Sequence, residues 1–549
     1  MSSTSPFPVL CVLVLSWFGN ASPCRAQVPV TERISVSAGG QEADGESYIG
    51  SVSQDGNLVA FSSEATNLVP GDTNGRIDIF LRDRQAGTLE RLPMGLGGAE
   101  PNGSSSSPEL SPDGRFLVFE SSADNLTAGD TNFSTDIFLL DRQSGGLEMI
   151  SHGIGGAPSN GSSVNPSVSS DGRFVLFTSF ASDLVPGDSN NMLDVFLHDR
   201  TLQATERISV DSNGVEANNG SFLTLLSVRG RGMSDDGRYV VFSTLADNLV
   251  ANDVNGVLDV FLRDRVAGTT IRISEDAGGV GGDEVSSDAV ISADGNSVFF
   301  RSEATNFSSQ VTSPFPHLYR FDRSTGAFDI VMVNSDGELP DASFLKATVS
   351  GDGSMVAFST FATNLLDSPA AASGWNVYAH EFSTGVTRLV SVNSNGRPQT
   401  ANQWVFTYYI ALSSQGRYAI FSSKANDLVS GDQNNQPDVF WHDLRIDGPG
   451  LDLSPLIAGQ NAQFTVDGAT PIGDLIIGFS SIGQGPVPTP FGLIHLNKPI
   501  QTFAFTADAA GQVNQTVNLP LSLAGASIWV QGVDLTMAYP TTIFHGIVQ

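Results

Sequence analysis

Five stretches of the sequence carry aspartate and asparagine at a spacing that could bind a cation. Each reads Asp-x-Asn-x-x-x-Asp, and the five sets are Asp72, Asn74, Asp78; Asp130, Asn132, Asp136; Asp188, Asn190, Asp194; Asp253, Asn255, Asp259; and Asp432, Asn434, Asp438. Calcium takes about six to eight oxygen ligands, and carboxylate and amide oxygens within one turn supply several of them. The spacing therefore predicts calcium as the cofactor of these loops.

The same residues have a second interpretation, because Asp and Asn also hydrogen-bond the backbone of their own turns. A complete EF-hand loop needs an acidic residue at its fifth position and Glu at its twelfth. The fifth position here is never acidic: it is Arg76, Ser134, Met192, Val257 or Gln436. Calcium binding and turn capping are therefore both open from the sequence.

Aromatic residues form a second group of candidates for ligand contact. They lie in two insertions, around residues 222–232 and 403–410, and the predicted ligand-binding residues are Trp404, Tyr408 and Tyr409. Aromatic rings at a loop can stack on a sugar or a peptide. Burial in a central channel or between neighbouring sheets is the alternative for the same rings.

No catalytic constellation accompanies these groups. The nearest approach to the Gly-x-Ser-x-Gly motif of serine hydrolases, at residues 478–483, has the wrong spacing, and no zinc-type histidine motif occurs. His198, His380 and His442 occupy one strand position that other repeats fill with Arg, Leu or Phe, which indicates a structural position. Both cysteines, Cys11 and Cys24, lie in the first 26 residues, so no thiol chemistry is expected beyond them.

A repeat organises the chain and must position all of these residues. The unit contains Ser-x-Asp-Gly, a strand ending in Phe-x-Ser, Ala-x-Asn-Leu, Gly-Asp-x-Asn, Asp-Ile/Val-Phe and Asp-Arg, and it occurs seven times. Its turns fall at Asp55, Asp113, Asp171, Asp236, Asp294, Asp352 and Gln415, in steps of 58, 58, 65, 58, 58 and 63 residues. Such a period is typical of a repeat architecture.

Each unit predicts four short strands, and four-stranded units repeated radially form a β-propeller. The seventh unit stops after its third strand. Residues 31–36 have the same sequence as residues 205–210, which form the predicted fourth strand of another unit. The N-terminal strand is therefore predicted to complete the last blade as a Velcro closure. In this arrangement the tight Ser-x-Asp-Gly and Asp-Arg turns share a short-turn end of the ring. The second-to-third and blade-to-blade loops share a long-loop end, where function is expected.

The Asn or Asp of Ala-x-Asn-Leu occurs in all seven units, at Asn67, Asn125, Asp183, Asn248, Asn306, Asn364 and Asp427, and is predicted to be structural. The Asp-x-Asn-x-x-x-Asp pattern is absent from units five and six, so the fold does not depend on it.

The text Ser-Pro-Asp-Gly-Arg-Phe-Leu-Val-Phe at residues 111–119, followed by Asp136-Ile-Phe, resembles the TolB-like (WD-like) propeller repeat over roughly residues 30–446. The resemblance implies a propeller and little about activity, because its members include periplasmic scaffolds and peptidase-associated propellers. The α/β domain of TolB has no counterpart here, so Tol-system function is not carried over.

Three segments are expected. Residues 1–26 are predicted to be a signal peptide, residues 27–446 the seven-bladed propeller, and residues 447–549 a small β-sandwich-like domain. The last segment is weakly similar to a module of secreted planctomycete proteins, through its text at residues 459–464, 489–492 and 506–511. An all-β protein that is secreted, extracellular or periplasmic, with no membrane span, is therefore expected.

The net charge of the chain limits the class of partner that it can bind. The formal net charge is −31, and loss of residues 1–26 removes one Arg and no acid, giving −32, which argues against nucleic acid. The favoured function is a non-catalytic binding or scaffold protein, calcium-stabilised in this hypothesis, that recognises a protein or polysaccharide through its long-loop end. The alternative is a glycan-active lyase or hydrolase whose acidic residues converge at the channel of the propeller.

Overall fold

The computed structural model describes residues 31–223, 228–229, 231–276, 278–308, 311, 315–334, 336–366, 375–393, 398–399 and 409–444, and the backbone of the strands from residue 450 onward. The predicted signal peptide, Trp404 and Tyr408 lie outside these residues. One short helix, η1 (Leu96–Gly98), is the only helical element in the described part of the chain.

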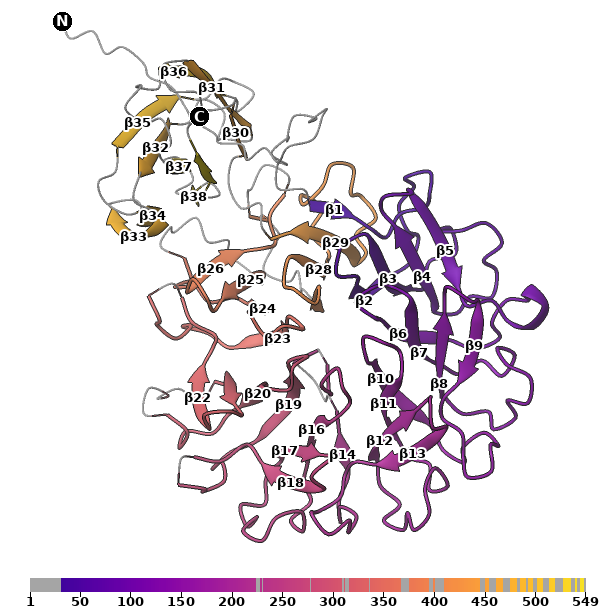
Figure 1. Cartoon of the computed structure of the whole chain (residues 1–549). Coiled ribbons are helices and arrows are strands. Elements are labelled where there is room, and N and C mark those ends of the chain that lie inside the picture. The colour runs from indigo at the N-terminus through magenta and orange to yellow at the C-terminus, as the bar shows by residue number, and fades with distance from the viewer. Residues whose placement is uncertain are drawn as a thin grey trace, which may run out of the picture.

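Seven antiparallel sheets are arranged in a ring, which confirms the predicted seven-bladed all-β propeller (Figure 1). Blade 1 contains β2 (Ser47–Val52), β3 (Leu58–Ser63), β4 (Asp78–Asp83) and β5 (Thr88–Leu92). Blade 2 contains β6 (Ser105–Leu110), β7 (Phe116–Ser121), β8 (Asp136–Asp141) and β9 (Gly146–Met149). Blade 3 contains β10 (Ser163–Val168), β11 (Phe174–Ser179), β12 (Asp194–Asp199) and β13 (Ala204–Arg207).

The remaining blades carry the irregular elements. Blade 4 contains β14 (Ser221–Phe222), β16 (Tyr239–Thr244), β17 (Asp259–Asp264) and β18 (Thr269–Arg272). Blade 5 contains β19 (Ser286–Ile291), β20 (Ser297–Ser302), β21 (His317–Asp322) and β22 (Ala327–Ile330). Blade 6 contains β23 (Phe344–Val349), β24 (Met355–Thr360), β25 (Asn376–Glu381) and β26 (Val386–Leu389), joined by β15 (Val228–Arg229). Blade 7 contains β27 (Ile410–Leu412), β28 (Tyr418–Ser423), β29 (Asp438–Asp443) and β1 (Thr31–Arg33).

Aromatic pairs explain why the repeat keeps Phe on its second and third strands. In blade 1, Phe61 and Phe80 face each other in register, and their ring centroids are 5.6 Å apart. The equivalent rings stack in every blade, at separations of 5.6 to 6.1 Å. Each blade thus contributes a stacked pair of buried aromatic rings to the core of the ring.

The Ser-x-Asp-Gly turns, which connect the first and second strands of a blade, pack against a neighbouring blade. Ser111 donates to Asp113, and Asp113 accepts from the backbone N–H of Arg115 at 3.0 Å, which closes the turn. Gly172, in the next turn, has a φ of 71°, and a Cβ there would lie 2.4 Å from the ring of Phe116. Glycine is therefore required, both for this backbone conformation and for the close approach of blade 3 to blade 2.

The Asn of Ala-x-Asn-Leu ties the second-to-third loop to the preceding blade-to-blade loop. Asn125 donates to the carbonyl of Glu100 at 2.8 Å and accepts from the backbone N–H of Asn102 at 3.1 Å. Equivalent bonds from Asn67, Asn248, Asn306 and Asn364 support the predicted structural role.

The ring closes as the fourth-strand sequence at residues 31–36 predicts. The strand β1 pairs antiparallel with β29, with Glu32 opposite Trp441. Ile34, immediately after β1, is fully buried and bonds to the backbone of Val439. The N-terminal strand therefore completes blade 7, as the Velcro hypothesis predicts.

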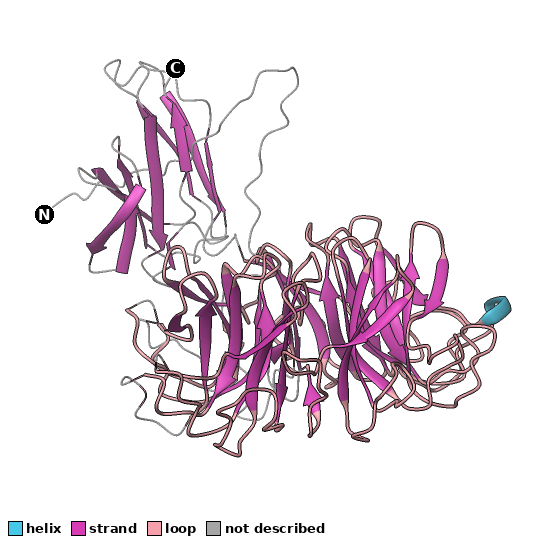
Figure 2. Cartoon of the chain, turned by 60° about the horizontal axis from the view of Figure 1, so that its bottom comes forward, coloured by secondary structure: helices cyan, strands magenta, loops and turns pink. Residues whose placement is uncertain are grey.

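Figure 2 shows the ring from the side, with strands running between its two loop-bearing ends. No helix in the described part of the chain is long and apolar enough to cross a membrane.

Ten strands lie beyond the ring in sequence. They are β30 (Gly450–Leu453), β31 (Asn461–Asp467), β32 (Asp474–Ser480), β33 (Gln484–Thr489), β34 (Gly492–Leu496), β35 (Gln501–Thr506), β36 (Val513–Asn518), β37 (Ser527–Asp534), β38 (Tyr539–Pro540) and β39 (Phe544–Ile547). They form three sheets. The expected β-sandwich stays a prediction.

Candidate functional site

The five predicted cation loops all lie at the long-loop end, between the second and third strands of blades 1, 2, 3, 4 and 7. Their asparagines cap the turn. In blade 1, Asn74 donates to Asp78 at 3.0 Å and to the carbonyl of Pro101 at 3.1 Å, while its Oδ1 accepts from the backbone N–H of Arg76. Asn132, Asn190, Asn255 and Asn434 make the same three bonds.

The two aspartates of blade 1 enclose a cation that belongs to the protein itself. The Nη1 atom of Arg91 lies 2.8 Å from Oδ1 of Asp72, 3.2 Å from Oδ2 of Asp78 and 2.9 Å from Oε1 of Glu100. Both aspartates and the arginine are buried. Buried carboxylates need such a partner, because an unpaired buried charge is very unfavourable.

Three other blades also place an arginine beside the first aspartate of the loop. Nη1 of Arg207 lies 3.3 Å from Oδ1 of Asp188 in blade 3. Nη1 of Arg272 lies 3.3 Å from Oδ1 of Asp253 and 3.8 Å from Oδ2 of Asp259 in blade 4. Nη1 of Arg33, supplied by the closing strand, lies 3.3 Å from Oδ1 of Asp432 and 3.5 Å from Oδ2 of Asp438 in blade 7. In these four blades an arginine thus stands where the sequence predicts a calcium ion.

Blade 2 is different. The four arginines pair across the sheet with Phe80, Phe196, Phe261 and Phe440, and the equivalent residue opposite Phe138 is Met149. The Oδ1 atom of Asp130, whose counterparts contact the guanidinium in the other blades, is buried and has no hydrogen-bond partner. Among the described residues, no three His, Cys, Asp or Glu side chains are grouped so that they alone could hold a metal ion. The calcium hypothesis stays a prediction, and its strongest place is blade 2.

Burial changes the pKa of the aspartates in these loops. It raises the pKa of Asp72, Asp130, Asp253 and Asp432 to about 6, and it also raises the pKa of Asp188. For Asp130 the nearby carboxylate of Asp136 raises the pKa further, while the backbone N–H of Asn132 lowers it. The first aspartate of each loop is thus held in a setting that disfavours its own charge.

A pH dependence follows for Asp130. The folded protein holds this proton more tightly than the unfolded chain, whose Asp has a pKa of about 3.9. The stabilisation from protonation is therefore fully present below pH 3.9 and lost as the pH rises through about 6. In the presence of chelator, we expect Asp130→Asn to melt near the wild type at pH 4 and above it at pH 7.5, measured by thermal unfolding.

Asp188→Asn is the matched control for this prediction. Its carboxylate contacts Arg207, so the substitution removes a partner from a buried cation and is expected to lower the melting temperature at pH 7.5. The same sign for both variants at pH 7.5 would contradict the account of blade 2.

Of the three aromatic candidates, Tyr409 lies within the described residues. Tyr409 is partly buried against the core between blades 7 and 1, and Lys346 lies over its ring at 5.3 Å. The three histidines of the third strand, His198, His380 and His442, are buried, as their strand position predicts. The ligand role of Trp404, Tyr408 and Tyr409 stays a prediction.

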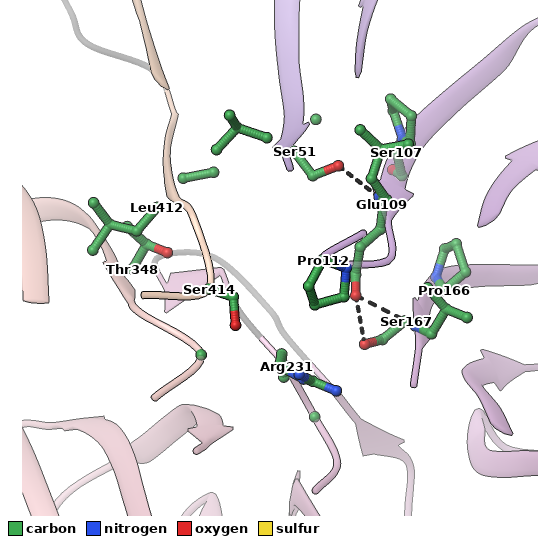
Figure 3. Close-up of a pocket in the computed structure, with 18 of the residues that line it drawn as sticks. Ser51, Ser107, Glu109, Pro112, Pro166, Ser167, Arg231, Thr348, Leu412 and Ser414 are labelled. Atoms are coloured by element: carbon green, nitrogen blue, oxygen red, sulfur yellow. Dashed lines mark hydrogen bonds between the residues drawn. The ribbon is translucent and has the colours of Figure 1, made fainter. Parts of the chain in front are cut away.

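A central cavity of about 150 Å³ was not foreseen from the sequence. It lies at the short-turn end, lined where the innermost strands end, by residues that include Ser51, Glu109, Ser167, Arg231, Thr348 and Ser414 (Figure 3). Oε1 of Glu109 accepts from the hydroxyl of Ser167 at 3.0 Å. Arg231 pairs with Asp235, and its Nε atom is buried with no partner.

The insertion of blade 4 supplies one wall of this cavity. Its strand β15 crosses to blade 6 and pairs parallel with β23, with Val228 opposite Ala347. Leu223 and Arg231, on either side of β15, line the cavity. The described residues of the insertion that line the cavity are Leu223, Arg231 and Gly232.

The cavity offers one carboxylate, that of Glu109, among its lining residues. Glycoside hydrolysis ordinarily uses two carboxyl groups flanking the scissile bond. The alternative of a glycan-active lyase or hydrolase stays a prediction.

No protein-family profile and no curated protein matches the sequence. Solved structures that resemble the chain include a protein described as TolB from Agrobacterium tumefaciens, with 14% identity, a TM-score of 0.32 and coverage of 55% of this chain and 83% of that chain. The RRP9 WD40 repeats match with 10% identity, a TM-score of 0.39 and coverage of 76% and 99%. The Dos1 propeller matches with 12% identity, a TM-score of 0.37 and coverage of 76% and 95%. These similarities concern the fold alone, and the count of seven blades rests on the strand pairing itself.

Proposed function

We propose that the protein is a secreted, non-catalytic binding propeller that recognises a protein partner through the long-loop end of blades 1 to 4. One observation carries the proposal: ten large apolar side chains are exposed in consecutive loops of this end. This apolar rim consists of Met94, Leu96, Phe133, Ile154, Phe180, Met192, Val215, Leu245, Val254 and Val280.

Two members of the apolar rim are unusually exposed. Val254 is 90% exposed, and Phe133 is 84% exposed while its backbone takes a φ of 55°. A bulky residue seldom adopts a positive φ, and strained, exposed residues at loop tips often serve function. Clustered exposed apolar side chains are typical of protein interaction surfaces.

Among the described residues, the short-turn end exposes fewer large apolar side chains than the long-loop end. Its exposed apolar residues include Leu202 and Val266, on turns of separate blades. The asymmetry between the two ends favours the long-loop end as the binding surface.

The net charge of −31 favours a partner with basic residues around its apolar contact surface and disfavours nucleic acid. Aliphatic and methionine side chains make up most of the rim, which suits a protein surface better than a polysaccharide, for which stacked aromatic rings are the usual contact. Secretion rests on the apolar leader at residues 1–26.

The test is capture of a partner by immobilised protein, residues 27–549, from the extracellular and envelope fractions of the source organism. The double variant Phe133→Ser, Val254→Ser is expected to lower the affinity for the captured protein at least about tenfold, because each buried hot-spot contact is worth about 2 kcal/mol. The matched control is Leu202→Ser, Val266→Ser, which changes exposed apolar residues at the other end. Equal capture by the rim variant, or no captured protein at all, would contradict the proposal.

A further inference from the structure

The repeats of this chain provide their own comparison for a cation site. In the five blades with an Asp-x-Asn-x-x-x-Asp loop, four place an arginine on the fourth strand opposite the aromatic residue of the third. The two blades that lack this loop pattern carry Ile330 and Leu389 at that position. The arginine therefore accompanies the acidic loop within one molecule, which indicates that the two aspartates require a cation between them.

Blade 2 keeps the aspartates and lacks the arginine. Met149 occupies the position, buried in the core between blades 1 and 2. In blades 1, 3 and 7 the arginine also pairs with a glutamate that lies nine residues later in the sequence, at Glu100, Glu216 and Glu42. The residue at the same spacing after Met149 is Pro158. Blade 2 thus lacks both the arginine and the extra carboxylate that pairs with it in blades 1, 3 and 7.

A buried polar atom without a partner marks this place. Oδ1 of Asp130 is shielded from solvent and accepts no hydrogen bond, although the same atom of Asp72, Asp188, Asp253 and Asp432 contacts an arginine nitrogen. A buried carboxylate oxygen with no donor is costly and calls for a bound ligand.

The donor set indicates which cation would fit. Asp130 Oδ1 and Asp136 Oδ2 correspond to the oxygens that flank the guanidinium elsewhere. The carbonyl of Gly129 corresponds to those of Gly71 and Gly187, which accept from Arg91 and Arg207 at 3.5 and 3.3 Å. Three oxygens carrying two negative charges suit a hard divalent cation, and calcium tolerates an irregular sphere completed by water.

From this comparison, we propose that blade 2 binds one calcium ion between Asp130 and Asp136, where other blades hold an arginine. With only three protein oxygens, the site resembles weak extracellular sites, whose dissociation constants are about 10⁻⁴–10⁻³ M. The inference does not depend on the binding face proposed above.

The experiment is equilibrium dialysis of the protein, residues 27–549, with radioactive calcium, together with thermal unfolding in calcium and in chelator. Met149→Arg installs the side chain that four blades already use, and it is expected to abolish one equivalent of calcium binding and the calcium-induced rise in melting temperature. Asp130→Asn is expected to abolish the same equivalent. The matched control, Met149→Leu, keeps an apolar residue at the position and should bind like the wild type.

Circular dichroism and the melting temperature in chelator establish that each variant is folded, and Asp130→Asn carries the test if Met149→Arg does not fold. Absence of calcium binding by the wild type up to millimolar concentration would overturn the proposal. So would calcium binding that persists unchanged in the folded variants.

Discussion

Replacing Arg91 with methionine is expected to lower the free energy of unfolding by about 3–5 kcal/mol, the usual effect of removing one partner from a buried ion pair. The guanidinium contacts three carboxylates, and two of them, Asp72 and Asp78, are buried. Chemical denaturation at pH 7 in chelator would measure the loss. The variant reproduces in blade 1 the residue that blade 2 carries naturally, so millimolar calcium is expected to restore part of the lost stability.

Arg115→Met is the matched control for this prediction. Arg115 makes two hydrogen bonds to Asp141, at 3.0 and 2.8 Å, but its side chain is 44% exposed. Exposed ion pairs contribute little, so this variant should unfold close to the wild type. Equal destabilisation by the two substitutions would show that the buried ion pairs of Arg91 contribute no more to stability than an exposed ion pair.

Deleting residues 27–36 is expected to abolish cooperative folding of the ring or to lower its melting temperature by tens of degrees. The deletion exposes the edge of β29, removes the fully buried Ile34, and takes Arg33 away from the buried Asp432 and Asp438. Burial of one isoleucine is worth about 1.5–3 kcal/mol and the lost ion pair about 3–5 kcal/mol, against a typical domain stability of about 5–15 kcal/mol. Scanning calorimetry would measure the change.

A deletion of residues 27–30, which ends before β1, is the control and should melt like the wild type. A synthetic peptide of residues 27–36, added in excess, is expected to raise the melting temperature of the longer deletion by pairing with β29. A ring that melts normally without residues 27–36 would show that closure does not depend on the N-terminal strand.

The fold could be predicted in detail because the same sequence features recur in each repeat and make the same contacts there. The Asp-Gly turns, the paired Phe residues and the Asn of Ala-x-Asn-Leu each make the same local contact in successive blades. The sequence at residues 31–36 indicated the closure for the same reason, because it matches the fourth strand that the seventh repeat lacks in its own sequence.

The sequence predicted only one part of the candidate site. The aspartates were found by their spacing, but their partners Arg33, Arg91, Arg207 and Arg272 lie some 20 residues away along the chain or, for Arg33, at its other end. A signal was present: the arginine recurs in the fourth-strand text of blades that carry the acidic loop, while Met149 interrupts it. The cavity beside Glu109 had no such signal, because five inner strands and one insertion build it from residues far apart in sequence.

The most direct test of the proposed binding face is amide hydrogen exchange of the protein, residues 27–549, with and without its captured partner. The account predicts slower exchange in the loops that carry the apolar rim, around Phe133, Ile154, Met192 and Val254, and unchanged exchange in the Ser-x-Asp-Gly turns. Protection confined to the short-turn end or to the segments that line the central cavity would contradict it and would place the binding site there instead.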